Sequence, residues 1–130
     1  MNISAASWPE QIIVRVKPSY LPEHSNPEQG EYAFAYAVEV SNNGNETVQL
    51  LSRHWIITDG NNSVREVQGE GVVGQQPHIA PGQTYRYSSG AILATKTGTM
   101  EGSYSMRSDS GEDFEAVIPT FGLIHPHSLQ

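Results

Sequence analysis

The sequence predicts an all-β domain: a fibronectin-III/immunoglobulin-like antiparallel β-sandwich of seven or eight strands. Three observations favour this fold. Apolar residues alternate with polar or small residues along much of the chain, which is the period of a half-buried strand. Twelve glycines and eight prolines punctuate the chain about every ten residues, a spacing typical of sandwiches and barrels. No window of eleven or more residues carries an unbroken helical stripe.

The strand expected at residues 31–41 shows the alternation most clearly. Aromatic and branched side chains share one face, and Ala33, Ala35 and Ala37 share the other. Small residues on the second face are expected of a central strand that is partly covered on both sides. Residues 46–59 form either two strands or one strand with a kink near Ser52. The expected strands cover residues 11–17, 31–41, 46–59, 63–68, 83–89, 100–106 and 113–119.

Turn residues separate these strands. Pro18 and Pro22 are expected to open a loop that reaches about residue 30. The segment Asn42–Asn45 contains Asn-Gly, which tolerates positive φ, and it predicts a hairpin turn. Pro119 is expected to end the last strand, so that the residues after it form a tail.

The composition indicates one acidic domain over residues 1–130, with a core at about 11–123 and short flexible termini. The chain has no cysteine, which excludes disulfides and thiolate chemistry and disfavours an antibody-type sandwich. No signal peptide and no membrane-spanning apolar run can be recognised. We therefore expect a cytoplasmic protein without a membrane partner.

Basic residues are few, and the formal net charge is −7. A nucleic-acid-binding domain usually presents a clustered basic face. The basic residues here are scattered along the sequence, so we predict no nucleic-acid partner and keep a local basic patch as an alternative. They are Arg15, Lys17, Arg53, Arg65, Arg86, Lys96 and Arg107.

The segment GEGVVG has the G-x-G-x-x-G spacing of a dinucleotide-binding loop, formed by Gly69, Gly71 and Gly74. That fingerprint requires a helix directly after the glycines, because the helix N-terminus holds the pyrophosphate. Pro77 and Pro81 forbid such a helix. Two interpretations remain: a structural connection between strands, or a nest of backbone N–H groups that binds an anion.

Candidate catalytic and metal-ligating residues are sparse. His54 lies in a predicted strand and should face away from Trp55, where Asp59 or Glu66 could join it. His125 and His127 resemble a chelating pair in the expected tail, short of the three or four ligands that a metal site needs. No nucleophile elbow or H-E-x-x-H motif occurs. We predict no catalytic residue, no metal and no cofactor.

Several longer segments together resemble the ApaG family. They are LLSRHWIITD at 50–59, VQGEGVVGQQPHIAPGQTYRYSSGAILAT at 67–95, GTMEGSYSM at 98–106 and FEAVIPTFGL at 114–123. The resemblance implies a fibronectin-III-like sandwich. It also implies links to cobalt resistance, to magnesium and cobalt efflux, and to diadenosine-tetraphosphate metabolism. Similar domains in eukaryotic F-box and polymerase-delta-interacting proteins imply protein binding, and the family implies no established reaction.

The leading functional expectation is a non-catalytic protein-interaction module whose partner is unknown. Edge strands of a sandwich can pair with a strand of a partner. The alternative is binding of pyrophosphate or a dinucleoside polyphosphate at the glycine loop, with or without a divalent metal; a nucleotide hydrolase is the last alternative. Formation of a homodimer is kept as a further alternative. The expected contact residues are Gly69, Gly71, Gly74, Arg53, His54 and Trp55.

Overall fold

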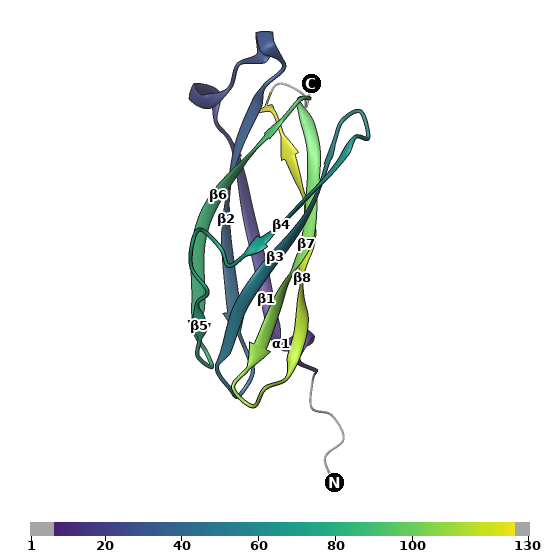
Figure 1. Ribbon diagram of the computed structural model, residues 1–130. Coiled ribbons are helices and arrows are strands. Elements are labelled where there is room, and N and C mark those ends of the chain that lie inside the picture. The colour runs from purple at the N-terminus through teal and green to yellow at the C-terminus, as the bar shows by residue number, and fades with distance from the viewer. Residues whose placement is uncertain (1–6, 127–130) are drawn as a thin grey trace.

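The computed structural model describes residues 7–126 as two facing antiparallel sheets (Figure 1). One sheet has the order β1 (Ile12–Tyr20), β2 (Tyr32–Asn42), β6 (Thr84–Leu93). The other has the order β4 (Val64–Glu70), β3 (Val48–Asp59), β7 (Thr97–Ser108), β8 (Asp113–Ile124), and β5 (His78–Ile79) pairs with β3. Short helical segments are α1 (Trp8–Gln11), η1 (Pro22–His24) and η2 (Pro27–Gln29). The predicted sandwich of seven or eight strands is confirmed.

The core lies between the sheets and is centred on Trp55, which is 2% exposed. Its ring meets those of Tyr36, Tyr104 and Phe121 at centroid distances of 5.3, 6.4 and 5.9 Å. Edge-to-face packing of this kind adds to the free energy gained from burial. The core also includes Trp8, which stacks on the ring of Phe114 and lies outside the predicted range 11–123. None of the helices among residues 7–126 has the length and apolar character needed to span a membrane.

Strand β3 is one continuous strand with a bulge, as the kink expected near Ser52 suggested. The register against β7 shifts between Leu50 and Ser52. A bulge inserts one extra residue and reverses which residues face inward. Val48 and Leu50 are buried before it, and Trp55 and Ile57 are buried after it. The bulge therefore turns Arg53 toward the interior.

Two proline predictions are wrong. β1 continues through Pro18 to Tyr20, and β8 continues through Pro119 to Ile124. Both strands are at the edges of their sheets, where a missing N–H donor need not break a ladder hydrogen bond. The first four residues of the predicted tail, 121–124, therefore belong to the end of β8.

The predicted hairpin at Asn42–Asn45 is also wrong. β2 pairs with β1 and β6, whereas β3 belongs to the opposite sheet. The segment carries the chain from one sheet to the other, and Asn42, which is fully buried, organises it. Its Nδ2 donates to the carbonyl oxygens of Glu46 and Ile79, at 2.7 and 2.9 Å, and its Oδ1 accepts from Gly44 N–H at 2.8 Å.

The two long sides of the sandwich differ. On one side β1 packs against β8. On the other side the edge strands are β4 and β6, and the side chain of Arg65 bridges them by donating to the carbonyl oxygen of Ile92 at 3.0 Å. This second side contains the candidate site.

Candidate functional site

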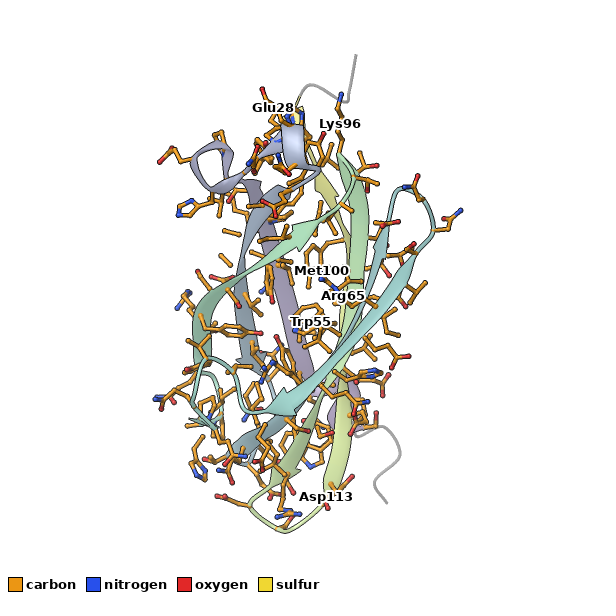
Figure 2. All side chains as sticks on the ribbon, turned by 45° about the horizontal axis from the view of Figure 1, so that its top comes forward. Glu28, Trp55, Arg65, Lys96, Met100 and Asp113 are labelled. Atoms are coloured by element: carbon orange, nitrogen blue, oxygen red, sulfur yellow. The ribbon has the colours of Figure 1, made fainter. Side chains whose placement is uncertain are left out.

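A groove of about 690 Å³ opens between β4 and β6. Its floor is formed by Tyr36, Trp55 and Met100, all from the buried core. Val67 of β4 lines it together with residues of β6, and Arg53 and Arg65 contribute the charges. Trp55, Met100 and Arg65 lie close together in the middle of the molecule (Figure 2). The groove is thus apolar at its base, and its two charged side chains are both cations.

Arg53 connects the groove to the glycine loop. Its Nη1 donates to the carbonyl oxygens of Glu70 and Gly71, both at 3.0 Å. A Cβ on Gly69 would lie 2.8 Å from the guanidinium nitrogens, so the first glycine of the motif leaves the space that Arg53 occupies. The loop therefore turns two carbonyl oxygens toward a cation. An anion nest would instead present converging N–H groups.

The other two glycines shape a two-residue turn. Val72 and Gln75 exchange both backbone hydrogen bonds, at 2.8 and 3.0 Å. Between them Val73 has φ 49° and Gly74 has φ 77°, and Gly71 before them has φ 65°. Positive φ at both central residues is typical of a type I′ turn. The motif is thus accounted for as a structural connection, while anion binding at the loop stays a prediction.

We expect Val73→Asn to stabilise the protein by about 1 kcal/mol. Val73 is 63% exposed, and a β-branched residue in the left-handed region is strained, whereas Asn-Gly suits a type I′ turn. The free energy of unfolding in urea measures the effect. Val64→Asn is the control, since Val64 is 61% exposed in a β-strand. Equal or lower stability of the Val73 variant would show that the turn is unstrained.

A pair of tyrosines lies between the sheets near Arg53. The hydroxyl groups of Tyr87 and Tyr104 are hydrogen-bonded to each other. Burial raises the pKa of the Tyr87 phenol to about 12 and also raises the pKa of Tyr104. Both phenols therefore stay neutral at physiological pH, so they can donate and accept hydrogen bonds but do not add negative charge beside Arg53.

His54 points to the outer face of the five-stranded sheet, away from the groove. Its Nε2 lies 2.8 Å from Oε2 of Glu66, which agrees with the expectation that His54 faces opposite Trp55. Asp59 is engaged elsewhere, because its Oδ1 accepts from the N–H groups of Asn61 and Ser63. His54 also borders a shallow hollow of about 480 Å³ on that outer face. Arg53 and Gly69 border the same hollow. The structure thus brings Arg53, Trp55 and Gly69 together, and it places His54 next to Arg53 and Gly69 with its side chain on the opposite face of the sheet from Trp55.

The histidine pair expected near the end of the chain is only partly described. His125 lies edge-on to the rings of Tyr20 and Tyr32, at centroid distances of 4.5 and 5.8 Å. His127 lies outside the described residues. Within residues 7–126 no group of three or more His, Cys, Asp or Glu side chains could hold a metal ion.

Comparison with known proteins shows the family. The ApaG domain matches residues 22–108, so the chain belongs to the ApaG domain family. A protein named ApaG from Pseudomonas paraeruginosa is 55% identical over 119 residues, which cover 92% of this chain and 94% of that protein. ApaG from Acidithiobacillus ferrooxidans is 53% identical over 115 residues, 88% and 91% of the two chains. A crystal structure of a Bordetella pertussis protein named ApaA has a TM-score of 0.86 and 50% identity, covering 88% of this chain and 94% of that one.

Several residues of the groove were missed in the sequence. Arg65 and Val67 alternate with the same period as Arg53 and Trp55, which is a usable signal for one shared face. The pairing of β3 with β4 places Arg65 opposite Ile57 and Val67 opposite Trp55. Residues of β6 come from the other sheet, and a local pattern carries no information about which strands face one another.

Proposed function

We propose that this ApaG domain is a non-catalytic module that binds an extended segment of another protein in the groove between β4 and β6. The observation that supports it is the placement of an apolar groove between two edge strands. Edge strands have unpaired N–H and C=O groups that can pair with an added strand. The aromatic floor would receive an apolar side chain, and Arg53 and Arg65 would favour a carboxylate beside it.

A photo-cross-linking amino acid at Val67 tests this proposal. Val67 lies inside the groove, and Glu66 next to it on the same strand points to the outer face. In cells that express each variant, we expect a discrete protein adduct from position 67 and several-fold less from position 66. Arg53→Ala and Gly71→Val are poorer probes, because both disturb the loop that Arg53 holds.

The control is the fold of each cross-linking variant, checked by circular dichroism. Equal adducts from positions 66 and 67 would mean that the contact is not specific to the groove. No adduct from a folded position-67 variant would reject the groove as the partner site.

In this proposal, the family's implied links to cobalt resistance, to magnesium and cobalt efflux and to diadenosine-tetraphosphate metabolism act through the bound partner.

A second candidate function is direct binding of pyrophosphate or a dinucleoside polyphosphate at the glycine loop. The observation that favours it is the proximity of the Arg53 guanidinium to Gly69. Titration with pyrophosphate, with and without Mg²⁺ or Co²⁺, should shift the amide resonances of Gly69–Gly74 in that case.

A further inference from the structure

Three basic residues from two distant segments of the sequence, Arg15 and Lys17 from one and Arg86 from the other, meet on the outer face of the three-stranded sheet. The strand register places Arg15 opposite Glu39 and Glu39 opposite Arg86, and it places Lys17 opposite Ala37. All five border one shallow hollow of about 560 Å³. Three of the seven basic residues of a chain with net charge −7 therefore lie on one small surface. We call this surface the basic face.

The charges of the basic face are not neutralised within residues 7–126. Glu39 is its one acidic residue, and its Oε2 accepts from Nε of Arg86 at 2.8 Å. Arg15 and Lys17 are exposed, and in the described part of the chain they form no ion pair or side-chain hydrogen bond. The face keeps an excess of positive charge, with Arg15 and Lys17 available to a partner.

The shape of the basic face favours an extended ligand. The middle strand β2 contributes the small side chain of Ala37 between Lys17 and Ser88, and Glu39, which is paired with Arg86, while the flanking strands β1 and β6 contribute long basic side chains. The result is a shallow trough along β2. Its two flanks, β1 and β6, are about 9–10 Å apart, which is twice the spacing of neighbouring strands in a sheet. Arg15 and Lys17 are two residues apart on one strand, hence about 6.6 Å apart along it. Carboxylates on alternate residues of an extended peptide have the same spacing.

We propose that the basic face binds an extended acidic segment of a partner protein, with acidic residues at alternate positions opposite Arg15 and Lys17. This is a second binding surface, separate from the groove, and it does not depend on the proposed function of the groove. The net charge of −7 makes the rest of the molecule repel such a segment, so that attraction is confined to this face.

A second copy of this chain is a weaker candidate for the ligand. Acidic side chains gather on the outer face of its five-stranded sheet, and four of them already have partners. Asp113 pairs with Arg107, Glu115 accepts from Ser103 and Ser105, Glu101 accepts from Thr120, and Glu66 contacts His54. These contacts would have to be given up or shared on self-association, whereas a separate acidic segment has no such cost.

The test uses a labelled dodecapeptide in which glutamate and threonine alternate, titrated with the full chain at low salt and followed by fluorescence anisotropy. We expect Arg15→Gln/Lys17→Gln to weaken binding about fivefold or more. Lys96→Gln/Arg107→Gln removes the same charge elsewhere and should change affinity less than about twofold. Ala37→Glu, which places a carboxylate in the trough, should also weaken binding. In the wild-type chain the amide resonances of β2 should shift on binding.

Four outcomes would overturn the proposal. The first is that the peptide does not bind. The second is equal loss of affinity in the two double variants, and the third is equal affinity for a peptide of the same composition with its glutamates in one block. The fourth is a different ligand for the basic face, shown either by tighter binding of a single-stranded oligonucleotide or by self-association of the wild-type chain that Arg15→Gln/Lys17→Gln abolishes.

Discussion

Replacing Gly102 with alanine should lower the free energy of unfolding by about 3 kcal/mol. Gly102 lies in β7 opposite Trp55 of β3. A Cβ at this position would be 2.0 Å from the carbonyl oxygen of His54 and 3.2 Å from Cα of Trp55. The obstructing atoms are backbone, so no side-chain rotation relieves the clash, and β3 and β7 would have to separate beside the core residue Trp55. Urea unfolding followed by tryptophan fluorescence measures the loss.

Gly122→Ala is the matched control, because Gly122 lies in β8, the neighbour of β7 in the same sheet. A Cβ there would contact only the side chain of Ile124, at 3.3 Å, and that side chain can move. We expect a change within about 0.5 kcal/mol. Similar stability losses in the two variants would mean that glycine is required in this sheet for a reason other than the close approach of β7 to β3.

The alternation of side chains was sufficient to predict the fold class and most of the strands. Tyr36 and Trp55 are buried where the period of two places them, since that period is a local property of the backbone. Pro18 and Pro119 misled the strand boundaries because proline breaks a strand only where its missing N–H is needed. Whether a strand is central or at an edge depends on distant partners, and the sequence around each proline does not contain that information.

The Asn42–Asn45 segment misled for a related reason. Asn-Gly predicts a turn correctly as local geometry, but whether the flanking strands pair is decided by the whole sheet. The same limit applies to charge. Arg15 and Arg86 are distant in the sequence and join one face only through the register of β2 with β1 and β6. The dispersal of basic residues along the chain was therefore a poor measure of their dispersal in space.

Asn42→Asp should destabilise the protein by about 3–5 kcal/mol at neutral pH. The side chain is fully buried, and its Nδ2 donates to two carbonyl oxygens. Aspartate would replace that donor with a charged acceptor facing the same two oxygens, so the ionised form is opposed both by burial and by repulsion. The link between the sheets would lose the hydrogen bonds to Glu46 and Ile79. Urea unfolding at pH 7 measures the difference.

Asn43→Asp controls for the added charge, because the neighbouring Asn43 is exposed. The free energy of unfolding of this control variant should change by less than about 0.5 kcal/mol.

The pH dependence of the Asn42→Asp variant separates the effect of ionisation from the effect of a poorly fitting side chain. Burial should raise the pKa of an aspartate at position 42 in the folded state, so the folded state would bind more protons than the unfolded state as pH falls toward the unfolded pKa. The stability gap to the wild type should therefore shrink at lower pH. A difference in stability from the wild type that does not depend on pH would mean that position 42 tolerates the ionised carboxylate. The loss of stability would then come from the shape of the side chain and not from replacement of the Nδ2 donor by a charged acceptor.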